Sequence, residues 1–207
     1  MELPWELTQV QTLDVFNNLT KGQTTDVIYQ QTFKSHREEY SDYKSIYTDG
    51  CKSEGHTASG VKFPDCTISE KLHPNCSVFT AESHAILLAL QYILTQKRTK
   101  LFIYSDSKSC IAALHNQSPN PHSIFNKILD TYDNLLQDGH KVTFCWIPGH
   151  TNVTGNEVAN SIAKLTNNLS NNPLTNSDVK KSIQNILESQ WQNCWKNETN
   201  NKLHAMH

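Results

Sequence analysis

The sequence predicts an α/β protein in which a mixed five-stranded sheet, with three antiparallel and two parallel strands, is flanked by helices. Two observations predict this class. Three segments with strand-like patterns follow one another closely between residues 45 and 72, as in an antiparallel meander. After residue 80, helical segments alternate with strand-like segments, and a strand–helix–strand connection makes its two strands parallel.

The meander is predicted from the alternation of side chains along each strand. Its three strands are expected at residues 45–52, 57–63 and 66–72. In the first strand, Tyr47 and Asp49 point to the same face, and Gly50 interrupts the pattern. A Pro-Asp turn at residues 64–65 joins the second strand to the third.

A helix is predicted next, from a cap at Thr80 to about residue 95. One stripe of this helix places a single carboxylate in line with apolar residues: Glu82, Ile86, Ala89 and Ile93. Residues 101–105 form a continuous apolar run, which is typical of a strand buried on both faces. Asp106 follows this run directly.

The later elements complete the alternating pattern. They are helices at about 107–115 and 121–137, a strand at 141–146, and a helix from Gly155 or Asn156 to about residue 165. The right-handed crossover rule favours placing the strand that precedes Asp106 beside the first strand. Ligands bind at the carboxyl ends of parallel strands in such a sheet, where Asp49 and Asp106 are expected.

The flanking segments differ from this central domain of residues 44–166. Residues 1–43 are polar with no sustained period, and they are interpreted as an N-terminal arm or linker. Residues 167–207 are interpreted as an Asn-rich linker and a C-terminal amphipathic helix, capped by Ser177 or Asp178. The apolar stripe of that helix needs a packing partner and consists of Val179, Ile183, Ile186, Leu187, Trp191 and Trp195.

Composition and charge limit the partners and the location. No apolar run is long enough to span a bilayer, and the N-terminus lacks the features of a signal peptide. We therefore expect a cytoplasmic or nuclear protein with no membrane partner. The net charge of -2 predicts weak affinity for nucleic acid in isolation, so that metal ions or a larger protein must supply the missing attraction.

Three acids carry the candidate chemistry: Asp49, Glu82 and Asp106. An Asp after a strand is usually only a turn residue, but neighbouring strands lie about 4.8 Å apart, and a helix packed across them can add a third carboxylate. Like charges this close need a cation to neutralise them. Carboxylate oxygens favour Mg²⁺ or Mn²⁺ over zinc, and a pair of such ions promotes phosphoryl transfer.

The chain resembles the type 1 ribonuclease H family. More narrowly, it resembles the ribonuclease H domain of reverse transcriptases from non-LTR, jockey-like retrotransposons. The resemblance covers roughly residues 44–165 and rests on five segments in the family's order: 46–51 around Asp49, 79–82 ending at Glu82, 103–107 around Asp106, 146–150 ending at His150, and 155–160 ending at Asn160.

This resemblance implies a fold, an activity and a set of roles. The fold would be ribonuclease H-like, and the activity would be endonucleolytic hydrolysis of the RNA strand of an RNA–DNA hybrid. The three acids would hold two Mg²⁺ ions, with Mn²⁺ as a substitute, while His150 would move protons or help the product leave. Residues that would meet the hybrid's minor groove are Gly50, Cys51 and Ser107.

One position departs from the family pattern. The fourth metal-binding carboxylate is expected ten residues after His150, where this chain has Asn160. An amide oxygen can still bind a metal, but it brings no charge. The substitution predicts a weakened second metal site, with slower or Mn²⁺-dependent hydrolysis that Glu157, one turn back, can partly offset.

Two other functions remain open from the sequence. The first is a catalytically dead domain that binds hybrid or tethers a reverse transcriptase, for which Asn160 is the support. The second is another nuclease of the same superfold, because acids at sheet ends recur there with different substrates. The His150 segment and the Gly-Asn-Glu segment at residues 155–157 favour a ribonuclease H over that second interpretation.

Overall fold

The computed structural model describes residues 9–16, 19, 23–116, 123–172 and 174–197. Within this part of the chain, six strands form one sheet in the order β1-β6-β5-β2-β3-β4. Their bounds are β1 Thr12–Leu13, β2 Lys44–Ser53, β3 His56–Lys62, β4 Thr67–Leu72, β5 Lys100–Ser105 and β6 Lys141–Trp146. Strands β2, β3 and β4 are antiparallel, while β5 runs parallel to β2 and β6. The predicted mixed α/β class and the placement of β5 beside β2 are confirmed.

The predicted number of five strands is wrong, because β1 pairs in parallel with β6 at the edge of the sheet. This two-residue strand lies in the segment that was interpreted as an arm. Its pairing partner is more than 130 residues away in sequence, with Thr12 opposite Phe144. Local side-chain alternation cannot reveal so short a strand.

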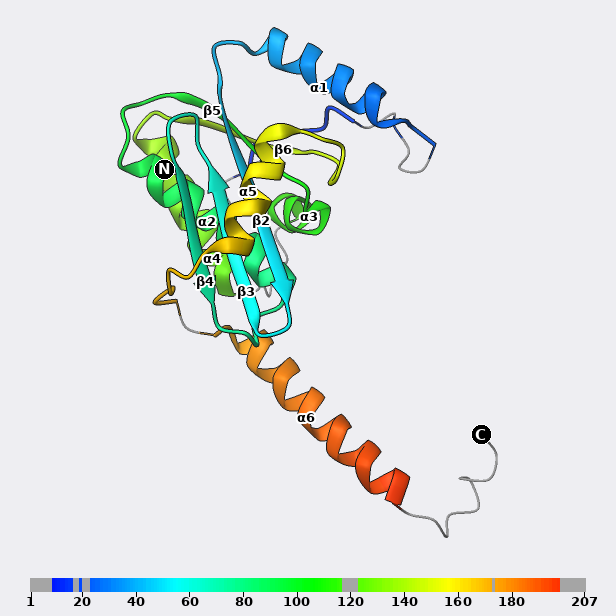
Figure 1. Ribbon diagram of the computed structural model, residues 1–207. Coiled ribbons are helices and arrows are strands. Elements are labelled where there is room, and N and C mark those ends of the chain that lie inside the picture. The colour runs from blue at the N-terminus through cyan, green and yellow to red at the C-terminus, as the bar shows by residue number, and fades with distance from the viewer. Residues whose placement is uncertain (1–8, 17–18, 20–22, 117–122, 173, 198–207) are drawn as a thin grey trace.

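Helices cover both faces of the sheet (Figure 1). On one face, α2 (Val78–Leu94) and α4 (Ser123–Gln137) pack on a core that includes Leu101 and Ile103 of β5. Helix α3 (Lys108–Asn116) adds residues to the same core. On the other face, Phe102 and Tyr104 pack against α1 (Asp26–Glu39), and α5 (Thr154–Leu165) crosses β2 and β3. The predicted start of α4 at Pro121 lies outside the described residues.

Helix α2 begins earlier than predicted. Ser77, rather than Thr80, is its N-cap residue, since the Ser77 side chain accepts a hydrogen bond from the backbone N–H of Thr80. The Thr80 hydroxyl lies 2.9 Å from the Ser77 hydroxyl and donates to the carboxylate of Asp178, with its oxygen 2.8 Å from Oδ2. Ser and Thr are both favoured at the N-cap, so residue preference alone does not decide between Ser77 and Thr80.

The N-terminal segment is part of the packed molecule. Phe33 of α1 contacts β5, with the rings of Phe33 and Tyr104 5.1 Å apart, and Tyr29 belongs to the same buried cluster through Phe16. His36 of the same helix is buried and hydrogen-bonded to the Tyr104 hydroxyl at 2.9 Å. Such a cluster stabilises the second face of the sheet by excluding water from large aromatic rings. Neither α1 nor this contact was predicted from the sequence.

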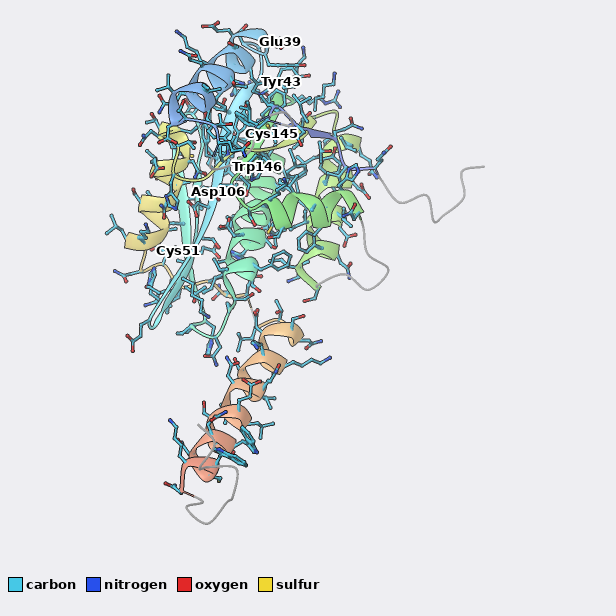
Figure 2. All side chains as sticks on the ribbon, turned by 90° about the vertical axis from the view of Figure 1, so that its right-hand side faces the viewer. Glu39, Tyr43, Cys51, Asp106, Cys145 and Trp146 are labelled. Carbon is cyan, nitrogen blue, oxygen red and sulfur yellow. The ribbon has the colours of Figure 1, made fainter. Side chains whose placement is uncertain are left out.

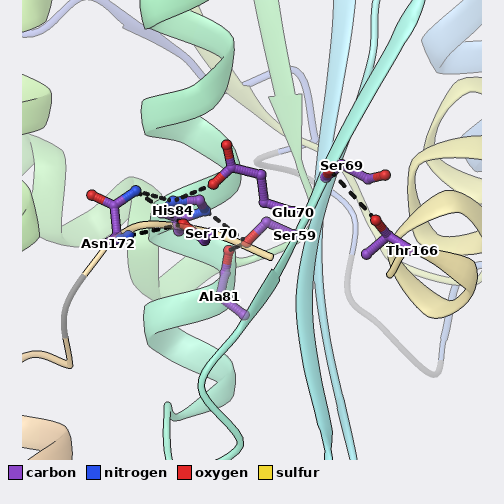
Figure 3. A network of polar contacts seen from close by, with 8 residues as sticks. All are labelled: Ser59, Ser69, Glu70, Ala81, His84, Thr166, Ser170 and Asn172. Atoms are coloured by element: carbon purple, nitrogen blue, oxygen red, sulfur yellow. Dashed lines mark hydrogen bonds and ion pairs between the residues drawn. The ribbon is translucent and has the colours of Figure 1, made fainter. Parts of the chain in front are cut away.

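The segment after α5 docks on the body before it reaches the last helix. The backbones of Lys71 and residues 168–170 exchange hydrogen bonds at the edge of the sheet. Figure 3 shows Asn172 beside the buried His84 of α2, with Nδ2 of Asn172 2.9 Å from Nε2 of His84. The same nitrogen of His84 lies 3.5 Å from a carboxylate oxygen of Glu70 in β4. The Asn-rich linker is therefore attached to both layers of the fold.

Helix α6 (Asn176–Asn197) leaves the body and extends away from the sheet (Figure 1). It begins slightly before the predicted caps, and Asp178 lies in its first turn. Its predicted apolar stripe is largely exposed, including Ile183, Leu187 and Trp191. In the described ranges, no helix is both long and apolar enough to span a membrane.

Candidate metal centre

Asp49 and Asp106 lie together where the parallel pairing of β2 with β5 ends, although β2 itself continues to Ser53 and Asp49 is not at its carboxyl end as predicted. Thr48 of β2 lies opposite Ser105 of β5, and each aspartate is the next residue of its chain segment. Strand β2 continues past Asp49 because β3 pairs with it on the other side, with Asp49 opposite Gly60. Asp49 is therefore held within a paired strand, whereas Asp106 follows the end of one.

Glycine allows α2 to bring the third acid to this edge. A Cβ atom on Gly50 would collide with the backbone nitrogen of Glu82, so the helix lies directly on the strand at this point. On the opposite face, a Cβ atom on Gly60 would collide with the carbonyl oxygen of Ala159 in α5. These two glycines thus admit one helix on each side of the acids. This role of Gly50 was not predicted from the sequence.

The three carboxylates converge as the sequence predicted. One oxygen from each of Asp49, Glu82 and Asp106 lies within 4.8 Å of the other two. Asp49 is 6% exposed and Glu82 is 9% exposed, while Asp106 is half-buried. Three carboxylates at such separations form a donor set that suits a hard divalent cation.

Burial and mutual repulsion make this cluster hard to ionise. Burial, and then the charge of Asp106, raises the pKa of Asp49 to about 8. Burial, and then the charges of Asp49 and Asp106, raises the pKa of Glu82 to about 9. Burial also raises the pKa of Asp106, although a hydrogen bond from Asn156 opposes the shift. A cation among these oxygens would favour their charged forms.

The hydrogen bonds around the cluster leave room for such a cation. Oε2 of Glu82 is buried and has no hydrogen-bond partner among the described residues. Buried polar atoms are normally paired, and an unpaired one at a possible ligand position is explained by an absent ion or water. The residues present therefore fit a divalent metal.

Asn156 is a contact residue that sequence reasoning missed. Its Nδ2 donates to Oδ2 of Asp106 at 3.2 Å, and its own Oδ1 is buried without a partner in the described chain. Asn156 is 3% exposed and lies in the first turn of α5. A signal existed, because Asn156 precedes Asn160 by one helical turn and so shares its face.

Asn160 lies half-buried in the middle of α5. Charged residues on either side of it along the helix act on the cluster: Glu157 raises the pKa of Asp49, and Lys164 lowers it. Residues three and four positions apart share one helix face. Asn156, one turn before Asn160, donates to Asp106, so the predicted fourth ligand position is on the same face of α5 as this contact.

The loop that carries His150 is attached to the same edge. Trp146 donates its indole N–H to the backbone oxygen of Asp106 at 3.1 Å (Figure 2). A Cβ atom on Gly149 would lie 2.6 Å from Oδ2 of Asp106. His150 follows in an exposed position with a φ of 62°, and Gln30 of α1 donates to the carbonyl oxygen of Thr151.

The three residues predicted to contact nucleic acid lie next to the acids along the chain but differ in their exposure. Gly50 is buried beneath α2, whereas Cys51 is half-exposed beside it. Ser107 lies directly after Asp106, and its N–H donates to the hydroxyl of Ser105 at 3.2 Å. Contacts of these three residues with a substrate stay a prediction.

Comparisons with known proteins agree with this geometry. The family model described as RNase H matches residues 41–168, which is more than half of the chain. That range contains all three acids as well as His150 and Asn160. No curated protein matches the chain.

Proposed function

The chain belongs to the ribonuclease H family, and from this premise we propose that it hydrolyses the RNA strand of RNA–DNA hybrids with two Mg²⁺ ions. The observation that carries the proposal is the convergence of three carboxylate oxygens within 4.8 Å, one of them from Glu82, whose buried Oε2 has no hydrogen bond within the described part of the chain. Mn²⁺ would substitute for Mg²⁺, because both prefer oxygen ligands.

The four residues proposed to hold the metals are Asp49, Glu82, Asp106 and Asn160. When bound, the ions would stabilise charge on the attacking and leaving oxygens of the phosphate. Asn156 would fix the orientation of Asp106 through its hydrogen bond. Such partners of metal ligands commonly change metal affinity or activity by about 10–100-fold when they are removed.

The remaining residues would act on the proton and on the substrate. His150 is exposed and close enough to Asp106 to lower the pKa of that carboxyl, so it can exchange protons at the edge of the site. Cys51 and Ser107, with the backbone at Gly50, would lie against the minor groove of the hybrid. As a working context, we propose a cytoplasmic or nuclear domain of a retrotransposon reverse transcriptase, which would supply much of the affinity for the substrate.

A second function, binding of the hybrid without cleavage, is favoured by one observation. Asn160 stands at the position of the fourth carboxylate, and its amide cannot balance a second cation. Glu157 is near enough to affect Asp49 electrostatically and would compensate in part. We place hydrolysis first because the three other acids are present and converge.

A cleavage assay separates these functions. The full chain and Asn160→Asp are incubated with a labelled RNA–DNA hybrid in Mg²⁺ and, separately, in Mn²⁺. We expect cleavage of the RNA strand by the parent. Asn160→Asp should gain about 10-fold or more in Mg²⁺, at least the effect of a single contact around a metal site, because a charged ligand replaces a neutral amide. The gain should be smaller in Mn²⁺.

Three results would change the proposal. Equal activity of both proteins in Mg²⁺ would show that position 160 is unimportant. Binding of hybrid with no cleavage by the parent in either metal would establish the non-catalytic function. Preferential cleavage of duplex DNA, run as a parallel reaction, would indicate another nuclease of the same superfold.

A further inference from the structure

A chain of hydrogen bonds connects the linker after α5 to the turn of α2 that carries Glu82 (Figure 3). At the linker end, Nδ2 of Asn172 lies 2.9 Å from Nε2 of His84. Across the imidazole ring, Nδ1 of His84 lies 3.2 Å from the hydroxyl oxygen of Ser59 in β3. That hydroxyl donates to the carbonyl oxygen of Ala81 at 2.7 Å. Because this carbonyl belongs to the peptide group that joins Ala81 to Glu82, the chain ends on the backbone of a proposed metal ligand.

Each bond in this chain has a defined direction. The Ser59 hydroxyl has one hydrogen and gives it to Ala81, so the Ser59 oxygen accepts from Nδ1 of His84. Nδ2 of Asn172 is a donor, so Nε2 of His84 accepts from it. A neutral His84 ring with its hydrogen on Nδ1 therefore satisfies all three bonds. In this tautomer Nε2 has no hydrogen to give to Glu70, although a carboxylate oxygen of Glu70 lies 3.5 Å away.

The peptide group between Ala81 and Glu82 is held against two strands. Gly50 of β2 lies directly beneath it, because a Cβ atom there would collide with the nitrogen of Glu82 and the carbonyl carbon of Ala81. Ser59 is paired opposite Gly50 in β3, and its hydroxyl bonds the oxygen of the same peptide group. Ser59 and Ala81 are both fully buried. A directional bond shielded from water in this way fixes the distance and the rotation of α2 over the sheet.

The linker that supplies Asn172 is docked by bonds of its own. The N–H of Lys71 in β4 donates to the carbonyl oxygen of Asn168 at 2.6 Å, and the N–H of Ser170 donates to the carbonyl oxygen of Lys71 at 2.8 Å. Nδ2 of Asn172 also donates to the Ser170 hydroxyl at 3.1 Å, which holds the amide beside His84. The family match ends at residue 168, so Asn172 lies outside the matched segment.

We propose that His84 is a positioning residue, which transmits the docking of the linker through Ser59 to the backbone of Glu82 and so sets where the Glu82 carboxylate meets a metal ion. The inference rests on the proposed metal site and adds to it a contribution from outside the family match. Oε2 of Glu82 has no hydrogen bond among the described residues, so the backbone is what places this oxygen. Removing a group that orients a metal ligand commonly lowers metal affinity or activity by about 10–100-fold.

The first experiment measures Mn²⁺ binding to the full chain without substrate, by electron paramagnetic resonance of the free ion. Ser59→Ala removes the hydroxyl with little change in volume, and we expect its Mn²⁺ dissociation constant to rise by about tenfold. Ser83→Ala is the matched control, because Ser83 is also fully buried and donates its hydroxyl to a backbone oxygen of α2, that of Phe79, at 2.8 Å. Urea unfolding should show similar losses of stability in both variants, while Ser83→Ala binds Mn²⁺ within about twofold of the parent.

The second experiment tests the route through His84, using Asn172 and Ser59, which both contact this ring. Asn172→Ala should weaken Mn²⁺ binding by about twofold or more. Asn171→Ala, which changes the exposed neighbour of the same type, should leave it unchanged. In the Ser59→Ala background, Asn172→Ala should have no further effect, because the chain of bonds is already interrupted. Additive effects of the two substitutions would overturn the route through His84.

Unchanged Mn²⁺ binding by Ser59→Ala, or equal losses of affinity in Ser59→Ala and Ser83→Ala, would overturn the positioning role. A hybrid-cleavage assay separates this failure from a failure of the proposed hydrolysis. If the parent cleaves the hybrid and Ser59→Ala binds Mn²⁺ like the parent, positioning is wrong and hydrolysis stands. If the parent binds Mn²⁺ without cleaving and Ser59→Ala binds it about tenfold more weakly, hydrolysis is wrong and positioning stands. Absence of Mn²⁺ binding by the parent would reject both.

Discussion

Two buried carboxylate sites in this protein have opposite hydrogen-bonding environments. Asp178, 2% exposed, joins the first turn of α6 to the start of α2. It accepts hydrogen bonds from the N–H of Ser77 and from the hydroxyls of Thr80 and Thr175. Burial alone would raise the pKa of Asp178, but these hydrogen bonds lower it below the ordinary value.

The acid cluster is buried to a similar degree with far fewer donors. Across the ranges that the structure describes, Oε2 of Glu82 has no hydrogen-bond partner, and the pKa of this carboxyl is raised to about 9 by burial and by the charges of Asp49 and Asp106. Burial therefore does not distinguish a functional acid from a structural one. The supply of donors does: Asp178 is satisfied within the protein, while Oε2 of Glu82 meets no donor among the described residues.

The largest expected effect is on catalysis by Glu82→Gln. We expect cleavage of the hybrid in Mg²⁺ to fall by at least about 100-fold, because a neutral amide replaces a metal-binding charge. The melting temperature in EDTA should stay equal or rise, since glutamine cannot take on a negative charge at this buried position. Both are measured on the same preparation.

Glu70→Gln is the matched control for this variant. Glu70 is also a glutamate with a buried oxygen lacking a hydrogen bond in the described chain, but it lies beside His84, away from the cluster. The Glu70→Gln variant should cleave the hybrid at the same rate as the parent. If Glu82→Gln and Glu70→Gln lost activity equally, the contrast between the two kinds of site would fail.

The second effect is on stability, through Asp178→Ala. Removing this carboxylate leaves the N–H of Ser77 and the nearby hydroxyls without their acceptor, so we expect a loss of about 1–3 kcal/mol in the free energy of unfolding. Urea denaturation measures it. Glu188→Ala, on the exposed part of the same helix, should change stability by less than about 0.5 kcal/mol. Cleavage per folded molecule should be unchanged, and a specific loss of activity would place Asp178 in the catalytic site instead.

The smallest effect concerns pH and metal together. The pKa values of Asp49 and Glu82 are raised to about 8 and about 9, so the folded state holds more protons than the unfolded state above the ordinary carboxyl pKa of about 4. The cluster's contribution to stability therefore falls as pH rises through this window. The contribution of Asp178 to stability depends on pH in the opposite direction: because its pKa is lowered, this contribution is lost as pH falls.

Mg²⁺ requires the deprotonated carboxylates, so it should stabilise the protein more at pH 8 than at pH 6. We expect a difference of about 1 kcal/mol at Mg²⁺ concentrations several times the dissociation constant. Thermal unfolding with EDTA or Mg²⁺ at the two pH values measures it. Glu82→Gln should reduce the difference, and an equal gain at both pH values in the parent would argue against metal binding by these acids.

The sequence predicted those parts of the molecule whose signals are local. Strand β6 was predicted with its observed bounds, and the stripe of α2 correctly included Glu82, because side-chain periodicity is a property of neighbouring residues. The sequence also predicted that the two aspartates lie together, because the right-handed crossover rule favours setting their strands side by side.

The parts that were missed depend on partners distant in sequence. Asp178 was considered as a cap of its own helix, yet it also binds Ser77, about 100 residues away. Tyr29 and its neighbours in α1 show no regular period in sequence, and their packing depends on the aromatic face that Phe102 presents. Asn156 was interpreted as part of a motif, and only the structure shows its amide on Asp106.

The smallest unit expected to fold stably includes the N-terminal helix α1 as well as the segment matched by the family. The family match starts at residue 41, after α1 ends at Glu39. A fragment cut at that boundary would expose Phe102 and Tyr104 to water and would lose the bond from Gln30 to Thr151 that steadies the histidine loop. An excised fragment of this size is thus expected to aggregate or to lose loop order, even with every acid retained.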